Sequence, residues 1–345
     1  MKDDMKKLLL LFSLTLMSIS AAAQMMPDST VQFVAYWDVG DKQAYNVSTS
    51  EYKVSESDTT EVEYSTEIRM FEVLAKTDST YKLAVTYKDV HYSDPQMNLL
   101  YQIMTETSGD MKVILTTDQH GSIKSIDNLE ELVSHQMKVV EPFMEMLGNE
   151  EGAELDEQTE AALKDYIVQT FSDPSIIEKS VYDEVGRMLY FHGNRLDMEK
   201  EYSGEIDAES IIPGMEAPIK AQTRVWIDTD YTDAYSAVGR IYTFIDNDTL
   251  LDYVVEYVKN LMSITGMSQE EIEKEVNESK DAIEQTALSS EEYTVVEVHM
   301  DTGWPLNVYY SRYINSKVEG ETTQKVKKTD VEIIISEYKK FDVKL

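Results

Sequence analysis

The most distinctive run of side chains in this sequence is Asp301-Thr302-Gly303-Trp304-Pro305. Gly303 permits a tight reversal of the chain and Pro305 fixes the backbone that leaves it, so Asp301, Gly303 and Pro305 predict a hairpin turn. Trp304 adds a large ring with an apolar body and a polar N–H. Two roles are open for Trp304: it seals the end of a sheet, or it gates access to a ligand.

The titratable residues do not form a familiar catalytic or metal-binding pattern. None of the 5 His belongs to an H-E-x-x-H motif, and the chain has 0 Cys. The nucleophile elbow, the phosphate loop and the dinucleotide fingerprint are all missing from the sequence. We therefore expect no catalytic residues, no metal site and no cofactor. An enzyme acting on glycans or peptides is the least supported alternative.

The first residues of the chain predict an export signal. Lys2, Lys6 and Lys7 precede an apolar run over residues 8–19, and Ala21-Ala22-Ala23 offers a cleavage site. The apolar run is shorter than the roughly 20 residues that span a bilayer. We expect a signal peptide over residues 1–23, a periplasmic or secreted protein, no lipid anchor on a Cys, and no stable membrane insertion after cleavage.

The charge balance limits the partners of this protein. With 31 Lys and Arg against 65 Asp and Glu, the formal net charge is −34. Such a charge repels the phosphate backbone of nucleic acids and anionic membrane surfaces. Nucleic acid is therefore excluded as a partner.

The hydrophobic pattern alternates between strands and helices. A period of two is clearest at Tyr81, Leu83, Val85 and Tyr87, and its change of phase at Val90 predicts a bulge near Asp89. In the strand before it, one face is expected to carry the residues of one parity, Val62, Tyr64, Ile68, Met70 and Leu74. Amphipathic segments at 127–148, 248–265 and 268–288 are expected to cover the sheet.

Together these patterns predict an α+β fold: a curved antiparallel β-sheet, like half of a barrel, covered by amphipathic helices. Residues 24–193 form a first meander with helical insertions, and residues 194–345 form a second meander with a helical hairpin, continuous with the first. Residues 111–126 and 293–309 share an apolar strand, a turn with Asp and Gly, and a second apolar strand. An internal duplication and a chance likeness of two hairpins both explain this.

The signal ending in Ala-Gln, the acidic β-rich chain and the Asp301-x-Gly303-Trp304-Pro305 hairpin resemble exported periplasmic proteins of Bacteroidota. The expected architecture also resembles the periplasmic lipoprotein-carrier (LolA/LolB-like) half-barrels. In that family, a hairpin with Asp, Gly and Pro precedes the late strands, and Asp301, Gly303 and Pro305 are the matching positions. The resemblance implies a helix-covered concave face that shelters an apolar ligand. It transfers no functional residue, because this chain is longer and more acidic.

Three short segments resemble the acceptor sites for O-glycosylation in exported Bacteroidota proteins. They are Asp28-Ser29-Thr30, Asp58-Thr59-Thr60 and Asp78-Ser79-Thr80. The resemblance implies that Ser29, Thr59 and Ser79 are candidates for modification.

These observations lead to two functional hypotheses. The first is a non-catalytic periplasmic binding protein that shelters a lipid or another apolar small molecule between sheet and helices. The alternative is a structural or interaction protein of the cell envelope, with an envelope protein as its partner, a solid core and no ligand. A hollow concave face favours the first hypothesis and a solid one favours the second.

Overall fold

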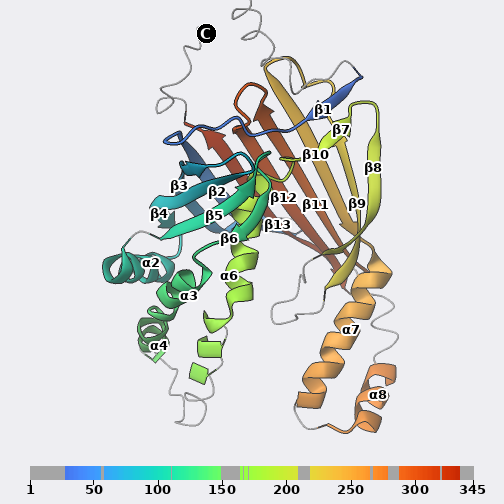
Figure 1. Cartoon of the computed structure of the whole chain (residues 1–345). Coiled ribbons are helices and arrows are strands. Elements are labelled where there is room, and N and C mark those ends of the chain that lie inside the picture. The colour runs from blue at the N-terminus through green and yellow to red at the C-terminus, as the bar shows by residue number, and fades with distance from the viewer. Residues whose placement is uncertain are drawn as a thin grey trace, which may run out of the picture.

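The computed structural model describes residues 28–55, 58–109, 111–148, 164–165, 167–169, 171–208, 218–264, 267–278, 287–318 and 321–334. The predicted signal peptide lies outside these residues. Within them, the chain forms one large antiparallel sheet of 11 strands and a few helices, so the fold belongs to the α+β class. Figure 1 shows that the sheet is strongly curved.

The strands of the large sheet are long near its centre and shorter toward both edges. In the first half of the chain they are β2 (Lys42–Ser55), β3 (Thr59–Lys76), β4 (Thr80–Tyr92), β5 (Lys112–Asp118) and β6 (Ile123–Ile126). In the second half they are β8 (Glu201–Ala208), β9 (Ile219–Ile227), β10 (Ser236–Ile245), β11 (Ala287–His299), β12 (Pro305–Val318) and β13 (Glu321–Ile333). A separate pair joins β1 (Thr30–Gln32) to β7 (Arg195–Asp197).

The strand order explains how one sheet forms from two halves of the chain. The order is β6-β5-β4-β3-β2-β13-β12-β11-β10-β9-β8, so each half is a meander and the halves meet where β2 pairs with β13. Strands β6 and β8 are the two edges, and the sheet is not closed into a barrel. Each meander begins with three strands and a helical insertion; two further strands, β5 and β6, follow in the first, and three, β11 to β13, follow in the second. The duplication itself stays a prediction.

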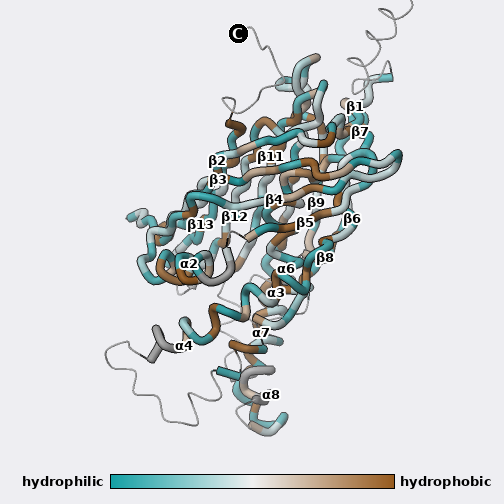
Figure 2. Tube along the Cα trace, turned by 60° about the vertical axis from the view of Figure 1, so that its left-hand side comes forward, coloured by the Kyte–Doolittle hydropathy of each residue, from teal (hydrophilic) through white to brown (hydrophobic). Residues whose placement is uncertain are grey.

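The alternation predicted for β4 is confirmed. Tyr81, Leu83, Val85 and Tyr87 are all buried. The register of β3 and β4 shifts between Thr66 and Ile68, opposite the predicted bulge, and Asp89 has a φ of 50°. In Figure 2 the hydropathy colours alternate along the strands, as expected for a sheet with one face against the core.

The helices follow bounds close to the predicted ones, but their placement differs. They are α2 (Pro95–Ser108), α3 (Leu129–Met137), α4 (Val140–Gly148), α6 (Pro174–Val181), α7 (Asn247–Ile264) and α8 (Gln269–Glu278), with a π-helix, η1 (Tyr182–Gly186), continuing α6. No helix in the described ranges is long and apolar enough to cross a membrane.

The helix inside the curve of the sheet is α6 with η1, which was not among the expected covers. Figure 1 shows α2, α3 and α4 beyond one end of the strands, and α7 and α8 beyond another part of that end. Helix α7 packs against β9 and β11, and α8 packs on α7. The expectation that segments 248–265 and 268–288 cover the concave face is therefore wrong for their described residues, whereas α3, within segment 127–148, buries Leu132 in the core. Their apolar stripes identify a buried side but do not identify the surface that buries it.

The core lies on the concave face, where two crossing segments fill the curve of the sheet. One is the N-terminal strap, defined here as residues 31–37, in which Val31, Phe33, Ala35 and Trp37 are buried. The other continues from η1 and buries Met188, Leu189, Phe191 and His192. This end of the concave face is therefore packed solid.

Backbone hydrogen bonds attach the N-terminal strap to both meanders. The N–H of Ala35 donates to His120 O in the β5–β6 turn at 2.9 Å, and the N–H of Tyr36 donates to Thr302 O in the β11–β12 turn at 3.1 Å. The N–H of Phe33 donates to Asn194 O at 3.0 Å. The two similar turns noted in the sequence thus bind neighbouring residues of one segment, and this holds the sheet in its curved shape.

His192 lies between the same two turns and makes stability depend on pH. Its Nε2 donates to Gly303 O at 2.6 Å. Burial lowers the pKa of His192 to about 4, although the Gly303 and Leu189 backbone oxygens favour the charged form. The unfolded chain, where a histidine pKa is about 6.5, takes up a proton that the folded protein excludes. Stability therefore falls as pH decreases from about 6.5 to 4, by about 3 kcal/mol in all.

Urea unfolding at pH 7.5 and pH 5 measures this dependence. In His192→Gln, whose amide can donate to Gly303 O, the difference between the two pH values is expected to shrink by more than half. His91→Gln, at an exposed position of β4, serves as the control and should keep the full difference. An unchanged difference in His192→Gln would show that other groups cause it.

Candidate functional site

Side chains on the concave face change from apolar to charged along the four central strands. Three successive rows of register partners cross β2, β13, β12 and β11: Val47, Val331, Val308 and Val296; then Thr49, Thr329, Tyr310 and Thr294; then Glu51, Lys327, Arg312 and Glu292. The first row is buried in the core. The face is therefore solid at one end and polar at the other, which differs from the wholly apolar face expected of a carrier.

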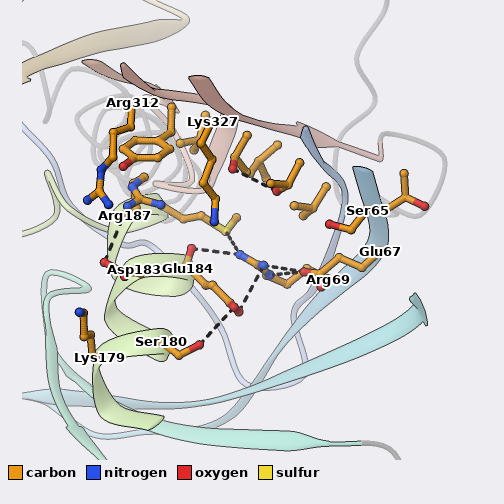
Figure 3. A pocket seen from close by; sticks show the side chains of 18 of the residues that line it. Ser65, Glu67, Arg69, Lys179, Ser180, Asp183, Glu184, Arg187, Arg312 and Lys327 are labelled. Atoms are coloured by element: carbon orange, nitrogen blue, oxygen red, sulfur yellow. Dashed lines mark hydrogen bonds and ion pairs between the residues drawn. The ribbon is translucent and has the colours of Figure 1, made fainter. Parts of the chain in front are cut away.

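A cavity of about 480 Å³ lies where α6 and η1 pass over these rows. Figure 3 shows its side chains converging from the helix and the strands. The strands contribute Val47, Thr49, Ser65, Thr66, Glu67, Arg69, Tyr92, Val308, Tyr310, Arg312, Lys327, Thr329 and Val331, and the helical segment contributes Ile176, Lys179, Ser180, Asp183, Glu184, Arg187 and Met188. Its volume falls within the roughly 300–1,000 Å³ typical of ligand pockets.

A buried arginine holds the helix over one wall of this cavity. Arg69 on β3 is 4% exposed, and its Nη2 lies 2.5 Å from Glu67 Oε1 and 3.5 Å from Glu184 Oε2. Its Nη1 donates to the backbone oxygen of Glu184 at 3.0 Å. Its guanidinium carbon is 5.3 Å from the ring centre of Tyr87. Arg69 thus connects the floor of the sheet to η1 by an ion pair and a backbone hydrogen bond.

Burial and neighbouring charges set the pKa values of Arg69 and of the side chains around it. Burial alone would lower the pKa of Arg69, but the carboxylates of Glu67 and Glu184 raise it, so the guanidinium stays charged. Burial raises the pKa of Glu67 against the opposing effect of Arg69, and the nearby Glu184 raises it further. Burial also raises the pKa of Tyr92 to about 12. Two carboxylates therefore share one buried cation.

Arg187 follows η1 and faces the sheet from the helix side. Its guanidinium carbon lies 3.7 Å from the ring centre of Tyr310, and its Nη2 lies 3.7 Å from Asp183 Oδ1. A cation over an aromatic face is attracted by the ring. The π-helix puts Asp183 and Glu184 at the same cavity wall, and single π turns are frequent at functional sites.

A second hollow, of about 220 Å³, lies on another side of α6. It is lined by Tyr87, Met104, Met111, Val113, Leu132, His135, Gln136, Ile176, Ile177, Ser180, Val181 and Glu184. Most of these side chains are apolar, and the methionines adapt readily to different shapes. Ile176, Ser180 and Glu184 line both hollows, so one stripe of α6 and η1 borders the two.

The predicted hairpin residues lie at the connection between β11 and β12. Gly303 has a φ of 72°, and its N–H donates to His299 O at 2.9 Å. Trp304 is 2% exposed and stacks on Trp37, with ring centres 4.4 Å apart and planes at 22°. It lines neither hollow. Its burial and its stack on Trp37 support the sealing role, and the ligand-gating role stays a prediction.

The three glycosylation candidates are separate from the cavity. Ser29, Thr59 and Ser79 are all exposed: Ser29 precedes β1, Thr59 begins β3, and Ser79 lies in the turn between β3 and β4. Their modification stays a prediction. Among the described residues, no three His, Asp or Glu side chains are grouped so that they could hold a metal ion.

The residues that line the cavity were not identified from the sequence. In β3, Val62 and Tyr64 belong to the parity predicted to share a face, yet both are exposed. Arg69 and Phe71, on the other parity, are buried. The signal was present as Glu67, Arg69, Phe71 and Val73 on the other parity. A charged pair in an apolar alternation indicates a partner on another element, and here that partner is η1.

The comparisons with known proteins give no close relative. Neither a protein-family model nor a curated protein matches the sequence. Among solved structures, lipovitellin, described for its lipid–protein interactions, aligns over 86% of this chain and 25% of its own, with 6% identity and a TM-score of 0.36. A loop-deletion mutant of OmpT, an outer membrane protein of Vibrio cholerae, aligns over 86% of this chain and 100% of its own, with 8% identity and a TM-score of 0.22. This chain thus spans about a quarter of lipovitellin, and likenesses at these scores decide neither family nor function.

Proposed function

We propose that this chain is a non-catalytic binding protein of the periplasm that holds an apolar or partly apolar small molecule between its sheet and α6. The observation that carries the proposal is the pair of hollows on either side of the Ile176–Ser180–Glu184 stripe. The smaller hollow has mainly apolar walls, and an apolar surface left open to water favours a ligand that covers it.

A second candidate, a structural or interaction protein of the envelope, has its own support. The concave face is solid around Trp37 and Trp304. The edge strand β8 is exposed from Glu201 to Asp207, and an exposed edge can pair with a strand of another chain. Such a protein would hold no ligand in its hollows.

Native mass spectrometry of the protein purified gently from its envelope fraction separates the two candidates. We expect a stoichiometric apolar adduct that is released on unfolding and recovered by solvent extraction. The stripped protein should bind the neutral dye Nile red. A bare polypeptide mass together with no dye binding would remove the binding proposal and leave the interaction protein.

Filling the boundary between the hollows tests the location. Ser180→Phe is expected to weaken Nile red binding at least tenfold, because its ring takes the space beside Ile176 and Glu184. Ser175→Phe, on the same helix but lining neither hollow, places the same ring at another exposed site and should leave binding unchanged. Equal binding by both variants would place the dye elsewhere.

A further inference from the structure

We propose that the ligand is an anionic amphiphile whose head group binds between Arg187, Arg312 and Lys327, while its apolar tail lies along the Ile176 side of α6. This inference rests on the proposed binding function and names the chemistry of the ligand. Figure 3 shows the three basic side chains along one wall of the larger cavity.

The first argument is the register of β12 and β13. Arg312 and Lys327 are direct partners across the two strands and point to the same concave face. Like charges directly opposite each other destabilise a strand pair. Glu292 on β11 and Glu51 on β2 reduce this repulsion only in part, because each lies on the outer side of its cation and not between the two. An anion between the cations would relieve it from within the cavity.

The second argument is how the carboxylates are shared. Arg312 forms a close ion pair with Glu292. Lys327 Nζ lies 3.7 Å from Glu51 Oε1, whereas Lys325 Nζ approaches the other oxygen of Glu51 at 2.8 Å. Of the two lysines paired with Glu51, Lys327 is therefore the more weakly bound, and its Nζ can donate to a ligand in the cavity.

The third argument is the place of Arg187. Its guanidinium lies over Tyr310, which is two residues before Arg312 on the same face of β12. The acidic neighbours at this wall are already engaged, Asp183 by Arg187 at 3.7 Å and Glu184 by Arg69 at 3.5 Å. Three cations from β12, β13 and the helical segment thus line one cavity, and such donors suit a carboxylate, phosphate or sulfate group.

The charge of the whole chain decides between a free anion and an amphiphile. At a net charge of −34, the long-range field repels small anions. A head group is retained only if other binding energy holds it near the three cations. The neighbouring apolar hollow, bordered by Ile176 and Ser180, provides that energy for a ligand with an apolar tail.

Titration calorimetry on the stripped protein tests the proposal with decanoate, 1-decanol and acetate. Decanoate is expected to bind about tenfold more tightly than 1-decanol, as one charge-assisted hydrogen bond would give, and acetate is not expected to bind. Lys327→Gln should remove most of that tenfold advantage and leave 1-decanol binding unchanged. Lys328→Gln changes the same charge on the same strand, but Lys328 lies over Tyr52 on the opposite face, so it should bind decanoate like the wild type.

Each other outcome has a definite meaning. Equal binding of decanoate and 1-decanol, or an unchanged preference in Lys327→Gln, overturns the head-group site and leaves the binding function in place. Acetate binding as tightly as decanoate overturns the amphiphile and indicates a site for free anions. No binding of decanoate or 1-decanol contradicts the proposed function itself.

Discussion

Replacing Gly303 with alanine is expected to destabilise the protein by about 4 kcal/mol or more, a size reached only by severe disruptions. An added Cβ would lie 2.2 Å from Val34 O and 2.8 Å from Ala35 Cα. These are backbone atoms of the N-terminal strap, so no side-chain rotation relieves the clash. The strap would have to leave the β11–β12 turn, breaking the Tyr36–Thr302 hydrogen bond and loosening the stack of Trp304 on Trp37.

A glycine with similar backbone geometry and open surroundings provides the control. Gly40 has a φ of 89° and no atom within 4 Å of an added Cβ. Gly40→Ala should therefore lower the free energy of unfolding only by the cost of placing a Cβ at a positive φ, about 1–2 kcal/mol. Urea unfolding of both variants should show Gly303→Ala the less stable by at least about 2 kcal/mol. Equal losses would show that the strap does not pack on the turn as described.

Arg69→Met is expected to cost about 3–5 kcal/mol, the usual range when one member of a buried ion pair is removed. Glu67 would keep its buried position without its cation, and Glu184 would lose the bond that fixes η1 over the sheet. The Glu67 pKa would rise further above its unfolded value. Because the folded variant then binds more protons than the unfolded chain, its loss of stability relative to the wild type should shrink as pH falls from 7.5 to 5.

The double variant Arg69→Met/Glu67→Leu separates the buried charge from the lost packing. Removing both charges should recover more than half of the loss, since apolar replacements of a buried pair are often tolerated. Urea unfolding at the two pH values measures all three proteins. A loss below about 1 kcal/mol in Arg69→Met, the size expected of a surface pair, would contradict the buried network.

The local features were predictable because they depend on neighbouring residues. The alternation in β4, the bulge near Asp89 and the hairpin around Gly303 follow from side-chain period and backbone freedom. The amphipathic segment predicted from residue 268 also begins with a local contact, because a side-chain oxygen of Glu271 accepts from the Ser268 N–H at 2.9 Å. Each of these needs only a few residues of sequence.

The candidate site was not predictable in this way because its residues are distant in the sequence. Arg69 pairs with Glu184, 115 residues later, and Arg187 stacks on Tyr310. Amphipathicity marked 127–148, 248–265 and 268–288 as covers, yet the segment inside the curve is α6 with η1. The segment that enters the curve buries Met188 and Phe191 among core residues from distant parts of the chain.

The sequence by itself determined an acidic, cysteine-free chain, its α+β class and its antiparallel meanders, because composition and period act locally. Only the tertiary structure decided that the two meanders join at β2 and β13, that Trp304 is sealed in the core, and that the concave face changes from valines to charged residues. Those outcomes depend on register between strands from opposite ends of the chain, and a shift of one residue would turn each side chain to the other face.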